Sequence, residues 1–127
     1  MKLRKFTVII ILLILILGYL LTRENKVTIY MGIANAELNE LPIKLSINNN
    51  IIYDDTLLNY HYKYEMITTK LRSGIHSVKI ENTNGSPKKS SVLALFNQHI
   101  VIEYYSPCGK KENCWEISNN LRKFRTE

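Results

Sequence analysis

The feature that most constrains this chain is an N-terminal apolar run from Phe6 to Leu21, broken only by Thr7 and Gly18. As a helix these sixteen residues span roughly 24 Å, short of the ~30 Å hydrocarbon core of a bilayer. Long basic side chains at both ends extend such a span by reaching the membrane interface. The basic residues at its ends are Lys2, Arg4, Lys5 and Arg23. The run therefore predicts a single membrane-spanning helix.

We expect this helix to be an uncleaved signal-anchor. Cleavage of a signal peptide requires small residues soon after the apolar core, whereas here the run continues into Leu20–Glu24. The one Ala-x-Ala match, Ala34–Ala36, lies well downstream. A cleaved signal peptide is the alternative, and a buried helix of a soluble protein is disfavoured because the run has no polar face.

Three basic residues precede the run and two follow it, beside the acidic Glu24. The positive-inside rule then places the N-terminus in the cytoplasm. Residues 1–26 are expected to form the anchor and a short polar stalk, and residues 27–127 one domain outside the cytoplasm, periplasmic or extracellular.

The net charge of +6 is concentrated near the anchor. Residues 1–26 carry +4, while residues 27–127 hold twelve basic and ten acidic residues, a net charge of +2. Nucleic-acid binding needs a concentrated basic face, so we do not expect a nucleic-acid partner.

Beyond residue 26 apolar and polar residues alternate in short runs, the period of a strand with one buried face. In 41–47, for example, the odd-numbered residues are apolar while Lys44 and Ser46 are polar. Strands are expected at 27–31, 41–47, 51–53, 75–80, 91–96, 100–105 and 115–117, with turns at 48–50, 54–55, 72–74 and 82–87, and 57–71 left open. About eight short strands with polar turns predict a mainly β fold, an antiparallel β-sandwich of Ig-like or small-barrel type.

The segment Leu71–Ile80, with the pattern L-x-x-G-x-H-x-V-x-I, resembles a strand of small exported β-sandwiches that include PEGA-type domains. Residues 46–53 match the hairpin that precedes this strand in those domains. The Pro-Glu-Gly-Ala residues that name the repeat are absent, and the likeness extends over about a third of the chain. The resemblance implies an exported accessory β-sandwich without catalytic activity.

The chain has two cysteines, Cys108 and Cys114, separated by the turn-forming residues 109–113. In an exported domain an even number of cysteines indicates a disulfide. We expect a bridge that closes a hairpin tip. A redox or metal pair and free thiols are the alternatives, although C-x-x-C spacing is absent and zinc requires further ligands.

No motif indicates an enzyme. The chain has neither the G-x-S-x-G elbow nor a glycine-rich phosphate loop. His61, His76 and His99 are far apart in the sequence, and 48–50 with 54–55 lack EF-hand spacing. We therefore expect no metal, no cofactor and no catalytic activity.

The strongest candidate binding feature is a row of alternate tyrosines, Tyr60, Tyr62 and Tyr64. On a strand the three rings would share one face, at roughly 6.5–7 Å spacing. Such a row suits a sugar or a protein partner, or it packs within the fold. The leading hypothesis is a structural or interaction module that docks an envelope protein or itself. The alternative is a module that binds a glycan or cell-wall polymer.

Overall fold

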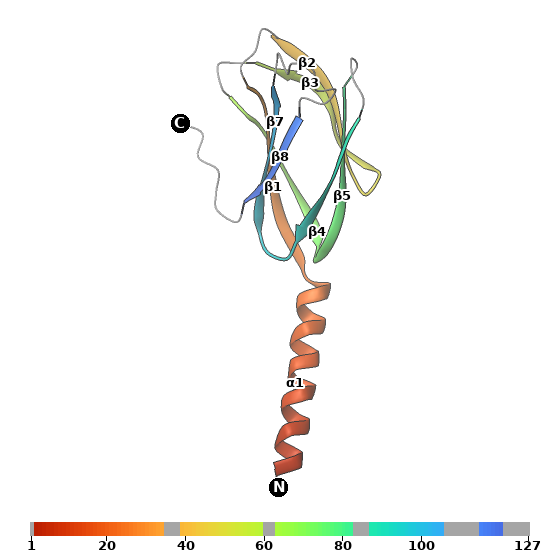
Figure 1. Ribbon diagram of the computed structural model, residues 1–127, viewed down its shortest axis with the longest axis vertical. Coiled ribbons are helices and arrows are strands. Elements are labelled where there is room, and N and C mark those ends of the chain that lie inside the picture. The colour runs from red at the N-terminus through yellow and green to blue at the C-terminus, as the bar shows by residue number, and fades with distance from the viewer. Residues whose placement is uncertain (1, 35–38, 60–62, 83–86, 106–114, 121–127) are drawn as a thin grey trace.

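In the computed structural model, which describes residues 2–34, 39–59, 63–82, 87–105 and 115–120, one helix leads into a sandwich of two four-stranded sheets (Figure 1). The helix is α1 (Lys2–Thr22), and the strands are β1 (Glu24–Ala34), β2 (Glu40–Ile47), β3 (Asn50–Leu58), β4 (Glu65–Arg72), β5 (Gly74–Asn82), β6 (Lys88–Ala94), β7 (Gln98–Tyr105) and β8 (Trp115–Asn120). The mainly β sandwich that the sequence predicts, preceded by an apolar helix, is confirmed.

The helix α1 is long and apolar enough to cross a membrane. Its segment Arg4–Thr22 has a mean hydropathy of 2.5 and buries none of its residues against the sandwich. Arg4 and Lys5 lie in its first turns, and Arg23 follows its last residue. A signal sequence has the same length and composition, so the helix alone does not distinguish an anchor from a leader.

Only Arg23 separates α1 from β1. The first strand begins three residues before its expected start, so that 24–26 belong to the sandwich and not to a stalk. The cause is Asn25, which is fully buried. Its amide accepts a hydrogen bond from Arg23 Nε at 3.2 Å and donates one to Ser73 Oγ at 3.0 Å. These contacts hold a polar segment in the fold.

In neither sheet do the strands lie side by side in the order in which they occur in the sequence. Sheet A has the strand order β4-β1-β7-β8, and sheet B has the order β3-β2-β5-β6. All neighbouring strands are antiparallel except β1 and β7, which run parallel with Val27 opposite Gln98. The first strand of the chain therefore lies inside sheet A, with β4 on one side and β7 on the other.

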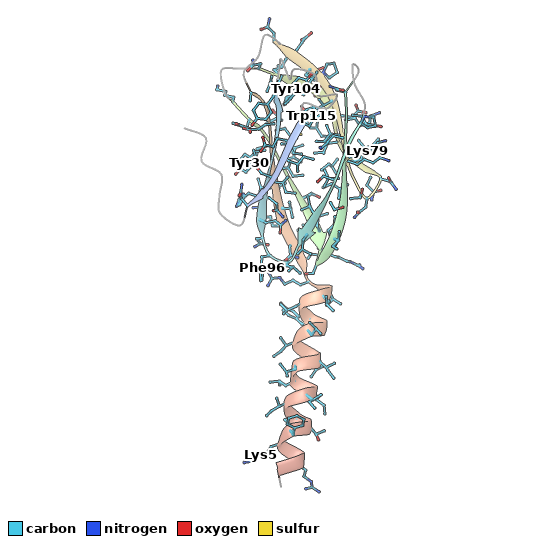
Figure 2. The ribbon with its side chains drawn as sticks, viewed as in Figure 1. Lys5, Tyr30, Lys79, Phe96, Tyr104 and Trp115 are labelled. Carbon is cyan, nitrogen blue, oxygen red and sulfur yellow. The ribbon has the colours of Figure 1, made fainter. Side chains whose placement is uncertain are left out.

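The core lies between the sheets and follows the alternation seen in the sequence. The inward residues of β1, β2 and β7 supply most of it, and Trp115 packs edge-on against Tyr104 with 5.0 Å between ring centroids (Figure 2). The buried members are Val27, Ile29, Met31, Ile33, Leu41, Ile43, Leu45, Ile47, Leu57, Leu71, Val78, Ile80, Val92, Ala94, Ile100, Ile102 and Trp115.

Two expectations for β2 and β3 need correction. The strand β3 does not end at Asp54–Asp55 but continues to Leu58, because both carboxylates of this edge strand are exposed to solvent. Ser46, expected to face outward, is buried beside a register shift that follows Leu45. The turn between these strands is confirmed: Asn48 and Asn49 both have positive φ, which asparagine tolerates.

Candidate functional site

Of the candidate binding residues, the structure describes only Tyr64. Tyr60, Tyr62, Cys108 and Cys114 lie outside the described residues, so the shared tyrosine face and the disulfide stay predictions. Tyr64 precedes β4 and is half-buried.

Tyr64 packs across the outer face of sheet A. A Cβ built on Gly32 would lie 2.6 Å from Tyr64 Cε1. The ring of Tyr64 therefore occupies the space that a side chain at position 32 of β1 would fill. Its hydroxyl donates a hydrogen bond to Glu103 Oε1 on β7. Burial of the ring, followed by this hydrogen bond, raises the pKa of Tyr64 to about 12.

A second tyrosine binds the same carboxylate. Tyr105 donates its hydroxyl proton to Glu103 Oε2 at 2.7 Å, and this bond raises the pKa of Tyr105 above its usual range. Glu103 thus accepts from a tyrosine with each oxygen. We call Tyr64, Glu103 and Tyr105 the tyrosine–glutamate cluster. Further along the same face, Tyr30 is buried and its ring centroid lies 5.9 Å from that of His99.

The two long sides of the sandwich are built differently. On the β6–β8 side, Gln98 is buried and donates to both Leu93 O and Asn119 Oδ1 at 3.0 Å. Asn119 also donates to Leu93 O at 3.4 Å. These bonds join β6 of sheet B to β7 and β8 of sheet A, and so bridge this side.

The opposite side contains an open cleft between β3 and β4, with a volume of about 340 Å³. We call it the β3–β4 cleft. Ile47, Ile52 and Leu71 supply its apolar part, and Lys70 and Arg72 stand at its rim. Its remaining lining residues are Glu24, Asn48, Asn50, Thr69 and His76.

His76 fixes one wall of the β3–β4 cleft. Asn48 Nδ2 lies 2.7 Å from His76 Nδ1, and His76 Nε2 lies 2.6 Å from Arg72 O. The network assigns the proton to Nε2, which then donates to the carbonyl while Nδ1 accepts from the amide. The imidazole therefore ties the β2–β3 turn to the end of β4.

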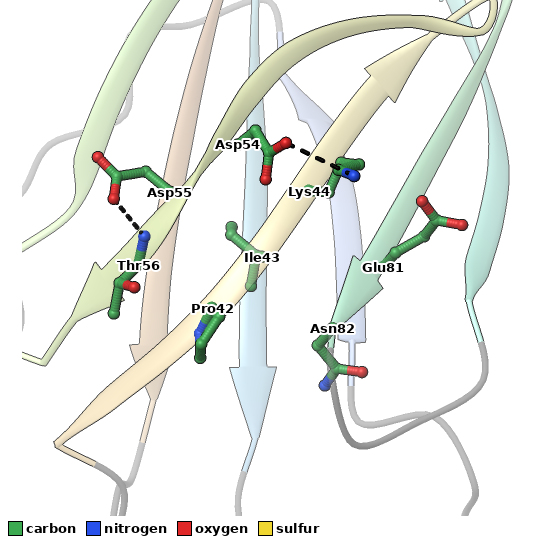
Figure 3. A pocket seen from close by; sticks show the side chains of 8 residues that line it. All are labelled: Pro42, Ile43, Lys44, Asp54, Asp55, Thr56, Glu81 and Asn82. Carbon is green, nitrogen blue, oxygen red and sulfur yellow. Dashed lines mark hydrogen bonds and ion pairs between the residues drawn. The ribbon is translucent and has the colours of Figure 1, made fainter.

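A shallow depression of about 380 Å³ lies over β2, β3 and β5 on sheet B (Figure 3). Its charges are largely neutralised: Lys44 Nζ lies 3.5 Å from Asp54 Oδ2, and Glu81 is paired with Lys79. Asp55 accepts a hydrogen bond from the backbone N of Thr56 at 2.7 Å. Paired carboxylates on an open surface offer little for catalysis.

Among the described residues, no group of three or more His, Cys, Asp or Glu side chains gathers as a metal site would require. His76 contacts Asn48 and Arg72, whereas the ring of His99 lies against Tyr30 on the outer face of sheet A, so these two histidines have different surroundings. His61 lies outside the described residues.

Sequence reasoning missed Glu103, Tyr105 and Gly32. One signal was available, because Glu103 is the only charged residue in the otherwise apolar and aromatic run 100–105. A carboxylate in such a strand needs a partner. Gly32 gave no comparable signal, since its role depends on a ring that comes from a distant part of the chain.

No protein-family model, no curated protein and no solved structure matches this chain.

Proposed function

We propose that the protein is a membrane-anchored module outside the cytoplasm, whose β-sandwich docks an extended segment of an envelope protein. The observation that supports this most is the difference between the two sides of the sandwich. Hydrogen bonds from Gln98 bridge the β6–β8 side, whereas the β3–β4 side, which His76 ties at one wall, holds an open cleft.

The β3–β4 cleft has the chemistry of a peptide groove. Edge strands have backbone groups directed away from their sheet, and an added strand satisfies them. Both β3 and β4 are edge strands. Ile47, Ile52 and Leu71 can receive apolar side chains, while Lys70 and Arg72 favour an acidic segment. The proposal requires no reaction chemistry in this chain.

Anchoring and orientation belong to the same proposal. The apolar run continues into Leu20–Glu24 without the small residues that a cleavage site needs, and this supports a span that stays attached. The three basic residues before the apolar run support a cytoplasmic N-terminus.

Site-specific photo-crosslinking in intact cells tests the docking surface. A photo-reactive amino acid replaces Lys70 in one strain and Lys89 in another. Both are exposed lysines on edge strands, but Lys70 lines the β3–β4 cleft and Lys89 lies on β6, across the sandwich. We expect Lys70 to yield one crosslinked envelope protein and Lys89 none.

If Lys70 instead crosslinks to a second copy of this chain, the occupant of the β3–β4 cleft is that copy and not an envelope protein. Equal crosslinking from both positions, or none from either, would refute docking at the β3–β4 cleft. Purification through a C-terminal tag and mass spectrometry identifies the captured species.

Binding of a glycan or cell-wall polymer is the second candidate, and the tyrosine–glutamate cluster favours it. Aromatic rings beside a carboxylate suit stacking on a sugar and hydrogen bonding to its hydroxyls. Tyr105 is 36% exposed, so part of the cluster is accessible to a ligand. Full-length protein in nanodiscs should then sediment with cell-wall polymer, and Tyr105→Ala should reduce the bound fraction. Exposed Met66 provides the control, Met66→Ala.

A further inference from the structure

The end of the sandwich next to α1 has an unusual concentration of exposed apolar side chains. Eight large apolar side chains of the described sandwich are exposed, and four of them lie at this end. They are Ile75 at 75% exposed, Phe96 at 53%, Leu93 at 49% and Leu95 at 42%. We call these four residues the basal patch.

The basal patch is contiguous in the fold. Ile75 on β5 is the register partner of Leu93 on β6, and the next pair is Gly74 with Ala94. Ile75 and Leu93 therefore stand side by side, since residues directly opposite on antiparallel strands are in contact. Leu95 and Phe96 follow directly in the β6–β7 loop, and Phe96 lies close to the end of α1 in Figure 2.

Hydrogen bonds hold this end of the sandwich against the helix junction. Ser73 N, in the β4–β5 turn, donates to Arg23 O at 3.1 Å. Asn97 Oδ1, in the β6–β7 loop, accepts from Lys26 N at 2.8 Å. Both tips that bear the basal patch are thus tied to the first residues after α1, and Figure 1 shows them beside the helix.

The length of α1 places the junction at the membrane surface. Its 21 residues span roughly 31 Å at ~1.5 Å per residue, close to the ~30 Å hydrocarbon core. Because a single residue joins α1 to β1, there is no spacer to lift the sandwich away from the bilayer.

We propose that the basal patch is a membrane-binding surface that inserts into the interfacial layer of the bilayer spanned by α1. For the basal patch we favour the bilayer over a protein partner, because Asn97 ties the loop that bears Leu95 and Phe96 to Lys26, four residues after the end of α1. The charge of this end agrees: 23–26, 72–76 and 93–98 hold three basic residues and one acidic residue, which suits anionic headgroups.

The inference rests on the proposed anchoring by α1, and the experiment separates the two. Full-length protein is placed in nanodiscs of phosphatidylcholine and phosphatidylglycerol, with and without phosphatidylcholine brominated high in its acyl chains. Bromine quenches a nearby indole. The native Trp115 is buried in the sandwich, so its emission in the unsubstituted protein gives the background.

Three variants each add one tryptophan. Phe96→Trp tests the basal patch and Tyr19→Trp, near the end of α1, reports the anchor. Met66→Trp is the control, because Met66 is 61% exposed but lies at the far end of β4. We expect brominated lipid to cause a comparable loss of emission from Phe96→Trp and Tyr19→Trp, and no loss from Met66→Trp.

Quenching of Tyr19→Trp without quenching of Phe96→Trp would overturn the inference and leave the anchor intact. Absence of quenching at Tyr19→Trp would overturn the anchor and the inference together. If Phe96→Trp does not fold, Leu95→Trp replaces it with the same expected result, because Leu95 is also exposed in the same loop.

Discussion

Gly32 provides the sharpest test of the tyrosine–glutamate cluster. In Gly32→Ala the new Cβ would lie 2.6 Å from Tyr64 Cε1 and 2.7 Å from Tyr64 Cδ1. This is about 1 Å short of a favourable carbon–carbon contact. The ring must therefore shift by about that distance, which is enough to break the bond between its hydroxyl and Glu103.

The expected cost follows from these contacts. A hydrogen bond to a charged group contributes ~1.5–3 kcal/mol, and the partial exposure of Tyr64 places this one at the lower end. Replacing glycine in a strand by alanine returns ~0.5 kcal/mol of backbone entropy. We expect a net loss of about 1 kcal/mol in the free energy of unfolding.

Urea unfolding of the full-length protein in detergent micelles measures this loss. The only tryptophan, Trp115, is buried in the sandwich and reports its unfolding. In the background of Tyr64→Ala, the same Gly32→Ala should be neutral or slightly stabilising. Gly18→Ala is the matched control, because nothing lies within 4 Å of its added Cβ. An equal loss with and without Tyr64 would refute the assigned contact.

Three further results follow from the structure. Leu45→Ala in the core, where Leu45 is 0% exposed, should cost ~2–5 kcal/mol in urea unfolding, whereas Ile51→Ala, 58% exposed, should stay within ~0.5 kcal/mol. Asn25→Ala should lower the free energy of unfolding by ~1–3 kcal/mol, because Arg23 and Ser73 lose their hydrogen bonds to the Asn25 amide. An unchanged unfolding midpoint would contradict this. The pKa of Tyr64 is raised from 10.0 to about 12, so its contribution to stability is complete below pH 10.0 and is lost as the pH rises through about 12. Tyrosinate absorbance measures this titration, and Glu103→Gln should move it to lower pH.

Local patterns predicted the elements in which apolar and polar residues alternate along the sequence. The run 41–47 alternates in this way, and its strand lies where expected, as does the turn at Asn48–Asn49, although Ser46 is buried. The apolar helix could also be predicted, because the length and composition of the run are enough to indicate a helix that could cross a membrane. Such features depend on near neighbours in the chain and can be read without knowledge of the topology.

Features that depend on distant contacts were not predicted. The sequence does not indicate β4, because its inward positions include the polar Thr69 and its outward positions the apolar Met66, so apolar and polar residues do not alternate. The extension of β1 to Glu24 depends on Ser73, and the place of Tyr64 depends on Gly32 and Glu103. The β3–β4 cleft arises from how the sheets are assembled, so no single segment indicates it.

The position of β1 has a consequence for how the chain folds as it is synthesised. Although β1 is the first strand made, its neighbours in sheet A begin only at Glu65 and Gln98. Sheet B is complete once residue 94 has emerged. A chain that stops before Gln98 therefore retains its helix and a whole second sheet. It nevertheless leaves one edge of its most buried strand without a partner, and such an edge invites pairing with other chains.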